Sequence, residues 1–394
     1  MKFIGILAYA KLSLIELYRL QRSDFLNFDI LFHSQQFVIL SCSSEVARKI
    51  GTRSGGIFKI GRMCGSSITE LLDTIPLPDR PKFNWTVSAY HCDEEILEET
   101  KDRFGEHLKR SSLGKARFIK PDPVGHGVEL KISTLVNSIL TGNMQREPGL
   151  DVIVACGSNE RFYGFTKYAS DVERFKERDF GRPYKDPTLT MSPRLAKTLV
   201  NLCCIARGRT VLDPFCGLGT VLQEALLLGY NVLGVEVSSA EVKRCRENLN
   251  WFANRFQISP KLNYKIIQGD AMELDSLKLP RVDAIATEPI LIPKLTANET
   301  AAKSEEILKQ SGEKYAEAFR AFSEILNHGG VVSIVVPDLI DDRGKSHRMD
   351  LINLVREYGF VPVRLNFPGF ENPCVVPTTK KKIIRRNIYL MQHG

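Results

Sequence analysis

The sequence predicts an α/β protein with a doubly wound, largely parallel sheet in its C-terminal half and a smaller mixed α+β region before it. Four short apolar strands in the C-terminal half each end in an acidic residue, which is typical of ligand binding at the carboxyl edge of an open α/β sheet. The first strand-like and helix-like segments follow a β-α-β-β-α order, which indicates a small mixed sheet. A chain of 394 residues has room for two to three domains, each with its own core.

The N-terminal half contains alternating predicted strands and helices. Strands are expected where β-branched and aromatic residues cluster, and helices where apolar residues recur with helical spacing. The predicted strands are 29–32, 37–41, 84–90, 116–119, 150–155 and 161–165, with a first strand near the N-terminus, and the predicted helices are 12–18, 44–49, 94–108 and 133–140. Prolines at 76, 78 and 81 place a subdomain boundary after residue 75.

A glycine-containing loop between a strand and a helix is the most informative segment of the chain. The strand 210–212 runs into Asp213, the loop contains Gly217 and Gly219, and the apolar helix 221–228 follows. The two glycines permit a sharp turn and bring bare peptide groups against a ligand. A carboxylate at this loop repels phosphate and attracts an ammonium group, which favours the methionine end of S-adenosylmethionine over NAD or ATP.

Three further strands are predicted downstream, and each has an acidic residue at or just after its end. Glu236 lies roughly 20 residues beyond the loop, the distance at which a βαβ unit brings an acid to ribose hydroxyls. Asp270 is expected to accept a hydrogen bond from the adenine amino group, and Glu288 follows the last of these strands. The predicted strands are 231–237, 264–271 and 282–287.

These motifs resemble those of the RNA guanosine-N2 methyltransferases that carry a THUMP domain, in the archaeal and small-genome bacterial branch of the tRNA position-10 type. The resemblance spans nearly the whole chain, is strongest from 178 to 288, and implies a Rossmann-like class I methyltransferase domain with a seven-stranded mixed sheet. It also implies S-adenosylmethionine as methyl donor, tRNA as substrate and an N-terminal THUMP-like RNA-binding region. It is carried by the segments 178–183, 191–196, 213–220 and 288–289.

The resemblance and the residue chemistry together assign the candidate site. Glu288 and Pro289 are expected to be catalytic, because a side-chain oxygen and a backbone carbonyl must accept the hydrogens of the target amine, and proline stiffens the loop. The residues expected to bind the cofactor are Asp213, Pro214, Phe215, Cys216, Gly217, Gly219, Thr220, Glu236, Asp270 and Ala271. The residues expected to bind the substrate are Ile290, Leu291, Arg182, Lys109, Arg110, Lys115 and Arg117.

The sequence departs from the family pattern after Pro289. The common family form is Asp or Asn, Pro, Pro and an aromatic residue, and the branch that this chain resembles most tolerates Glu-Pro with an aromatic residue next. Here Ile290 and Leu291 follow Glu288-Pro289 instead. An aromatic ring stacks on a flipped base and contributes roughly 1–3 kcal/mol. Three interpretations remain open: the enzyme is slower, another ring such as Phe215 or Tyr184 replaces the missing one, or catalysis has been lost.

Two alternative functions therefore stand beside RNA methylation. A noncatalytic RNA-binding relative is favoured by the missing aromatic residue, but a pure binding module has no need of the cofactor acids. An amino-methylating DNA enzyme shares the acid-proline chemistry, but the N-terminal region and the glycine loop argue against it. The need for a small activator protein is left open.

The expected domains are a ferredoxin-like α+β subdomain (1–75), a THUMP-like RNA-binding domain (76–168), a linker (169–192) and the Rossmann-like methyltransferase domain (193–394). A helix is expected from Pro193 with Ser192 as its N-cap. Near the C-terminus we expect a helix at 315–326, strands at 331–336, 361–365 and 383–390, and a polar, mobile segment at 293–312.

Composition supports a polyanionic partner without requiring one. The net charge is +8 and the pI about 8.9, and basic residues cluster from 101 to 120 and from 380 to 386. The nine cysteines form no C-x-x-C pair, which predicts reduced, mostly buried thiols, no metal site and a packing role for Cys216. No export signal or membrane span is recognised, so a cytoplasmic protein is expected.

Overall fold

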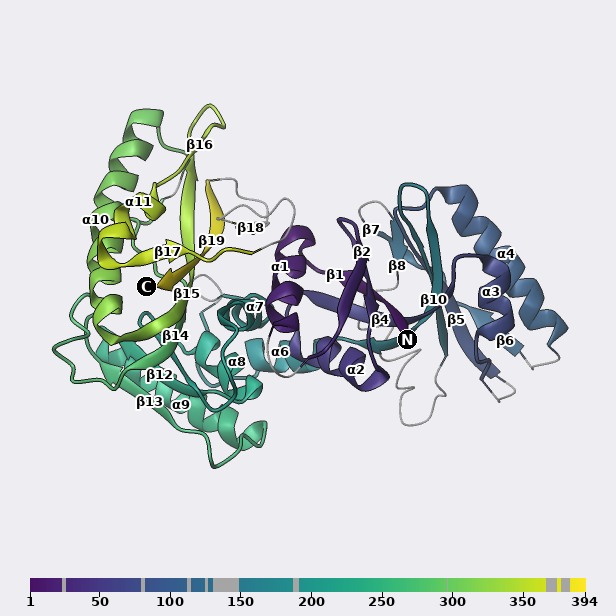
Figure 1. The fold of residues 1–394 in the computed structure, drawn as a ribbon, viewed down its shortest axis with the longest axis horizontal. Coiled ribbons are helices and arrows are strands. Elements are labelled where there is room, and N and C mark those ends of the chain that lie inside the picture. The colour runs from purple at the N-terminus through teal and green to yellow at the C-terminus, as the bar shows by residue number, and fades with distance from the viewer. Residues whose placement is uncertain are drawn as a thin grey trace. The chain divides into compact units, whose positions relative to one another are not determined.

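The computed structural model describes residues 1–22, 26–78, 82–111, 115–124, 127–129, 149–186, 191–295, 297–365, 374–376 and 383–394. The predicted helix at 133–140 lies outside these residues. The chain folds into two compact units. Unit 1 comprises Met1–Leu14 and Asp24–Lys176, and unit 2 comprises Ile15–Ser23 and Glu177–Gly394. Figure 1 shows the elements of both units.

Unit 2 is built on a mixed sheet with the strand order β13-β12-β11-β14-β15-β19-β17. Strands β11 to β15 pair in parallel, and β19 runs antiparallel between β15 and β17. Two short strands, β16 and β18, pair with β15 and β19. The bounds are β11 Thr210–Asp213, β12 Asn231–Glu236, β13 Tyr264–Gln268, β14 Val282–Thr287, β15 Leu326–Ile340, β16 Ser346–His347, β17 Phe360–Pro362, β18 Cys374–Val376 and β19 Ile384–His393.

Helices cover both faces of this sheet, with α10 and α11 on one side and α7 and α8 on the other (Figure 1). The α10 face buries a large apolar core in which Phe319 packs between Phe322 and Phe360. The predicted start of α7 is confirmed, because Ser192 caps it and Pro193 is its first residue. The bounds are α7 Pro193–Cys203, α8 Thr220–Leu228, α9 Ser239–Arg255, α10 Ala301–Ile325 and α11 Leu351–Val355, with a 3-10 turn η2 at Arg356–Tyr358.

The prediction of a mobile segment at 293–312 is wrong for its second half. Residues from Ala301 onward form the first half of α10, capped by Thr300, whose side chain accepts a hydrogen bond from the Lys303 amide. Ile307 and Leu308 are buried here against Leu339 of β15. The polar residues that suggested mobility lie on the solvent face of an amphipathic helix.

Unit 1 is built on one continuous sheet with the strand order β2-β3-β1-β4-β10-β9-β5-β8-β7, and β6 pairs with β5. Its strands are β1 Lys2–Leu7, β2 Asp29–His33, β3 Phe37–Ser41, β4 Ile57–Gly65, β5 Lys82–Tyr90, β6 Lys115–Phe118, β7 Asp122–Val124, β8 Gly127–Glu129, β9 Leu150–Cys156 and β10 Arg161–Ala169. Its helices include α2 Ser44–Arg53, α3 Ile68–Thr74 and α4 Glu94–Arg110, while α1 Ala10–Gln21 and α6 Val172–Phe180 each extend into unit 2. Strand β4 and helix α3 were not predicted.

The core of unit 1 contains a buried ion pair as well as apolar clusters. Lys59 Nζ lies 2.8 Å from Asp151 Oδ2, and both side chains are inaccessible to solvent. Ser88 Oγ donates to the other oxygen of Asp151 at 2.8 Å. These residues come from β4, β9 and β5, and β10 lies between β4 and β9 in the sheet. Thr166 of β10 also donates a hydrogen bond to Asp151, so the network crosses four neighbouring strands.

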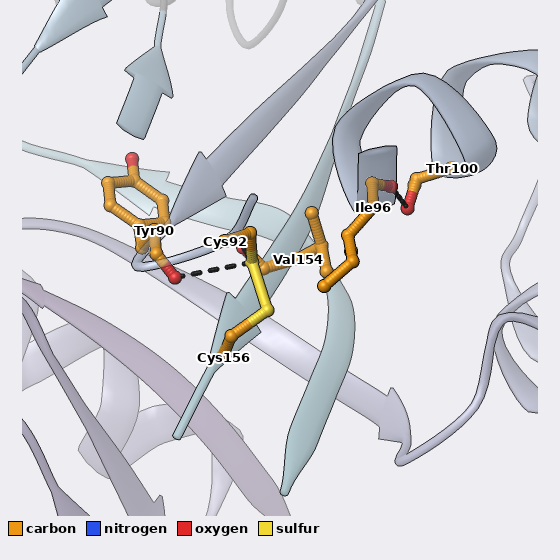
Figure 2. Close-up of a disulfide and its surroundings, with 6 residues drawn as sticks. All are labelled: Tyr90, Cys92, Ile96, Thr100, Val154 and Cys156. Atoms are coloured by element: carbon orange, nitrogen blue, oxygen red, sulfur yellow. Dashed lines mark hydrogen bonds between the residues drawn. A yellow bond between two sulfur atoms is a disulfide. The ribbon is translucent and has the colours of Figure 1, made fainter. Parts of the chain in front are cut away.

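The prediction that all nine thiols are reduced is wrong for one pair, because Cys92 and Cys156 form a disulfide (Figure 2). Cys156 is the last residue of β9, and Cys92 follows the end of β5. These strands run parallel with Tyr90 opposite Ala155, which brings the two Cα atoms within 5.3 Å. Because the two cysteines are 64 residues apart in the sequence, no local pattern indicates that they are close in space.

Among the described residues, none of the helices combines the length and the apolar composition that a membrane-spanning helix requires. Within the same residues no group of three or more His, Cys, Asp or Glu side chains is arranged to hold a metal ion. The predicted domain limits at 75, 168 and 192 stay predictions.

Candidate active site

A cleft of about 910 Å³ lies in unit 2 at the carboxyl ends of β11, β12, β13 and β14. These four strands are neighbours in the sheet and run parallel, so the residues that follow them meet at one edge. The cleft lining contains Asp213, Glu236, Asp270 and Glu288, the four predicted strand-end acids. It also contains Pro214, Phe215, Cys216, Gly217, Thr220, Ala271, Ile290 and Leu291.

The loop between β11 and α8 needs glycine at two positions. Gly217 and Gly219 have φ angles of +48° and +86°, in the left-handed region that other residues rarely adopt. An added Cβ at Gly219 would lie 2.8 Å from Cys245 Sγ, whereas one at Gly217 would meet no atom within 4 Å. Gly219 therefore allows close packing on α9, and Gly217 turns bare backbone toward open space.

Asp213 is almost fully buried at the end of β11 and accepts two hydrogen bonds. Thr287 Oγ1 donates to Asp213 Oδ1 at 2.7 Å, and the Phe215 amide donates to the same oxygen at 3.2 Å. Burial raises the pKa of Asp213 to about 7, although both hydrogen bonds favour the ionised form. This carboxyl is therefore partly protonated near neutral pH.

Glu236, at the end of β12, binds the glycine loop through its carboxylate. Its two carboxylate oxygens accept hydrogen bonds from the Gly217 amide at 3.1 Å and the Ser238 amide at 3.0 Å. Val237, the next residue, is 66% exposed and lines the cleft. Asp270 Oδ1 accepts a hydrogen bond from the Met272 amide at 2.9 Å, which fixes the turn after β13.

Glu288 lies at the end of β14 and forms an ion pair with Arg386 of β19, with Nε 2.7 Å from Oε1. Burial raises the pKa of the Glu288 carboxyl, and the Arg386 charge opposes this rise. Pro289 follows, and then Ile290, which is 62% exposed at the cleft. The acid and an exposed apolar side chain thus share one wall of the cleft.

Helix α7 and the segment before it contact α8, the helix that follows the glycine loop. Arg178 Nε donates to Glu224 Oε1 of α8 at 2.5 Å, and Lys197 Nζ lies 3.6 Å from Glu224 Oε2. Arg182 Nη1 donates to Thr220 Oγ1 at 2.8 Å, and Arg182 is buried. This placement favours support of the cofactor loop by Arg182 over the contact with RNA that the sequence suggested.

The two rings considered as replacements for the missing aromatic residue both line the cleft. Phe215 packs against the apolar core of the α10 face. Tyr184 has the Arg244 guanidinium 5.8 Å from its ring centroid. Cys216 is buried, in agreement with a packing role.

The other basic residues assigned to substrate binding, which are Lys109, Arg110, Lys115 and Arg117, belong to unit 1. Lys109 and Arg110 lie in the last turn of α4, and Arg117 lies in β6; all three are exposed. Arg110 Nη2 lies 3.2 Å from Glu106 Oε2 of the same helix. The side chain of Lys115 lies outside the described residues.

Sequence reasoning missed several residues of the cleft. Val237 could have been found, because it is an apolar residue directly after a strand-end acid. The link between Arg386 and Glu288 has no local signal, since the two residues are far apart in the sequence. The cleft is also lined by Tyr184, Lys185, Glu241, Arg244, Met272, Lys314 and Glu317.

The strand order, the glycine loop and the strand-end acids give unit 2 a Rossmann-like fold. Residues 181–321 match the family described as RMKL-like, methyltransferase domain. TrmN from Thermus thermophilus has a similar fold, with a TM-score of 0.54 at 17% identity over all of both chains. The structure of SMU.472, solved with SAH, has a TM-score of 0.50 at 12% identity over 99% of this chain and 97% of that one. The predicted Rossmann-like fold is confirmed.

Two curated archaeal relatives are both described as tRNA (guanine(10)-N2)-dimethyltransferase. The one from Methanothermobacter thermautotrophicus is 32% identical over 163 residues, which is 41% of this chain and 43% of that protein. The one from Methanocaldococcus jannaschii is 32% identical over 199 residues, or 49% and 51%. The aligned part of the chain spans about half the length of these relatives. They confirm the predicted resemblance, whereas the THUMP domain stays a prediction.

Proposed function

We propose that the protein is an S-adenosylmethionine-dependent RNA methyltransferase that modifies the exocyclic N2 of a guanosine in tRNA. The observation that carries this proposal is that the glycine loop, the acids at 213, 236 and 270, and Glu288 all line one cleft. The relatives' names support tRNA guanosine as the substrate.

The cleft residues fit this cofactor. The backbone at Gly217 faces open space, Glu236 and Asp270 offer acceptors for hydroxyl and amino groups, and Val237 presents an exposed apolar surface. Asp213 offers a carboxylate to an ammonium group. When bound, S-adenosylmethionine supplies a methyl group on a positively charged sulfur; transfer to the amine nitrogen leaves a neutral thioether and releases one amine proton.

The protein side of the reaction is carried by the residues after β14. An exocyclic amine is a poor nucleophile because its lone pair is delocalised into the ring. Glu288 accepts one amine hydrogen and the adjacent backbone accepts the other, which localises the lone pair on nitrogen. Holding this nitrogen in line with the methyl group supplies much of the rate. Ile290 supplies an apolar surface to the base.

We further propose that unit 1 binds the RNA through Lys109, Arg110 and Arg117. Phosphate contacts release counterions, so each lost contact reduces the salt slope of binding by about 1. Replacing all three by glutamate in the full chain is expected to weaken tRNA binding and flatten its salt dependence. Lys261→Glu, an exposed basic residue of unit 2, is the matched control. Equal affinity of both variants would remove unit 1 from this role.

Methyl transfer to RNA tests the function itself. The full chain is incubated with labelled S-adenosylmethionine and either unmodified tRNA or duplex DNA. We expect label in tRNA alone, and at least roughly tenfold weaker cofactor binding by Glu236→Ala, about 1.4 kcal/mol. Label in DNA would support the DNA enzyme. Binding of cofactor and tRNA with no label in either substrate would support the noncatalytic relative.

A further inference from the structure

The contact between Glu288 and Arg386 joins two elements that are not neighbours in the sheet. Glu288 follows β14, whereas Arg386 belongs to β19, and β15 lies between them. Arg386 pairs with Pro337 of β15 in the antiparallel register and reaches Glu288 Oε1 through Nε at 2.7 Å. The Glu288 side chain is 18% exposed and that of Arg386 40%.

A glutamate at this position needs such an anchor. Compared with aspartate, glutamate adds one methylene and one rotatable bond between backbone and carboxylate. An acceptor that must meet a single amine hydrogen loses rate when it samples several rotamers, because misplacement by about 1 Å costs on the order of a hundredfold. A charged hydrogen bond from guanidinium to one oxygen restricts those rotamers.

We propose that Arg386 is a positioning residue that holds Oε1 of Glu288 and leaves Oε2 to accept a hydrogen from the target amine. This inference rests on the proposed function. Arg386 is not among the cleft-lining residues of the described chain, whereas Glu288 is, so Arg386 acts through the carboxylate.

The charges around Glu288 give the arrangement a pH signature. Arg386 from β19 favours the ionised carboxylate and burial disfavours it. The charge of Glu288 in turn raises the pKa of the Asp213 carboxyl of β11 and of the Tyr315 hydroxyl of α10, the ionisable groups that face it from those elements. Removing the arginine leaves the effect of burial, which favours the neutral form of Glu288, without a compensating charge. A protonated Glu288 is a weaker acceptor, so the acidic limb of the rate profile must move to higher pH.

Full-length variants test the positioning role. We expect Arg386→Gln to lower the single-turnover rate of methyl transfer by roughly tenfold or more, with a larger loss at pH 6 than at pH 8.5. Its dissociation constants for S-adenosylmethionine and tRNA should stay within about twofold of those of the unmodified protein. Arg386→Lys keeps the charge and should recover part of the rate. The matched control is Arg385→Gln, because Arg385 is the exposed neighbour on the opposite side of the same strand.

Two results would overturn the inference. One is an unchanged rate in Arg386→Gln, and the other is a loss confined to tRNA affinity, which would make Arg386 a phosphate contact. Isotope-edited infrared spectra, taken as differences from Glu288→Gln, report the carboxylate without any activity. Its titration should move to higher pH in Arg386→Gln, and no movement would refute the pair. Failure of the unmodified protein to methylate any RNA, with this movement present, would refute the proposed function and leave the ion pair confirmed.

Discussion

Asn248 on α9 binds both backbone groups of Tyr184. Its Oδ1 accepts a hydrogen bond from the Tyr184 amide at 2.9 Å, and its Nδ2 donates to the Tyr184 carbonyl at 3.0 Å. The same Nδ2 donates to the Leu218 carbonyl of the glycine loop at 3.0 Å. One buried amide thus ties two stretches of the cleft wall together, and its removal leaves three backbone groups without this partner.

Asn248→Leu is therefore expected to weaken S-adenosylmethionine binding by roughly tenfold, because a loop that is ordered only on binding costs affinity. Asn248→Asp keeps the acceptor for the Tyr184 amide but loses both donors, so its cofactor affinity should lie between those of Asn248→Leu and the unmodified protein. Calorimetric titration of cofactor measures both. Asn250→Ala, an exposed position on the same helix, serves as control. Unaltered affinity in Asn248→Leu would show that the tie has no bearing on the cofactor.

Asp213 predicts how cofactor affinity varies with pH. Its pKa of about 7 means that affinity should rise from pH 6 to pH 7.5, as the carboxyl ionises and attracts the cofactor ammonium. The ammonium itself loses its proton at about pH 8, so affinity should pass through a maximum. In Asp213→Asn the acidic limb should disappear. An acidic limb that persists in this variant would assign the titration to another group.

The same shift makes a stability prediction. The folded-state pKa is raised, so the stability that Asp213 contributes is full below its unfolded pKa of about 3.9 and is lost as pH rises through about 7. The unfolding temperature of Asp213→Asn minus that of the unmodified protein should therefore be larger at pH 8.5 than at pH 5.5. Thermal unfolding at both pH values checks the sign.

A substitution at Ile290 is expected to increase the rate of methyl transfer. It is exposed at the cleft where the family pattern leads to an aromatic residue. Ile290→Tyr should raise kcat/KM for tRNA, since a stacked ring contributes roughly 1–3 kcal/mol. Ile290→Ser should lower it, and neither change should alter cofactor affinity. A tyrosine variant without any gain would indicate that Phe215 or Tyr184 already provides the stacking surface.

The ion pair of unit 1 predicts a large loss of stability from a single change. Asp151→Leu leaves Lys59 buried without its counter-charge, which costs about 3–5 kcal/mol. The double change Lys59→Met and Asp151→Leu should recover much of this. Chemical unfolding of the unmodified protein, Lys59→Met, Asp151→Leu and the double variant forms a double-mutant cycle and gives the coupling energy. Equal losses in single and double variants would contradict the account.

The local sequence predicted those parts of the site that a short segment determines. The glycine loop and the acids at 213, 236, 270 and 288 are placed by strands that the pattern of apolar residues reveals, so the shared cleft could be anticipated. The Cys92–Cys156 disulfide, the Asn248 contacts and the Arg386 ion pair depend on sheet order. That order joins residues far apart in the chain, and no local pattern reports it. The helix at 301–312 was not predicted because most of its residues are polar and only a narrow stripe of them is buried.

The most direct test of the central claim is the identity of the methylated nucleoside. Unmodified tRNA is incubated with the full chain and S-adenosylmethionine carrying a deuterated methyl group, then digested and analysed by mass spectrometry against nucleoside standards. We predict deuterated N2-methyl- or N2,N2-dimethylguanosine with the unmodified protein and none with Glu288→Ala, whose cofactor affinity should be nearly unchanged. Label on another atom or base, or full activity in Glu288→Ala, would contradict the account.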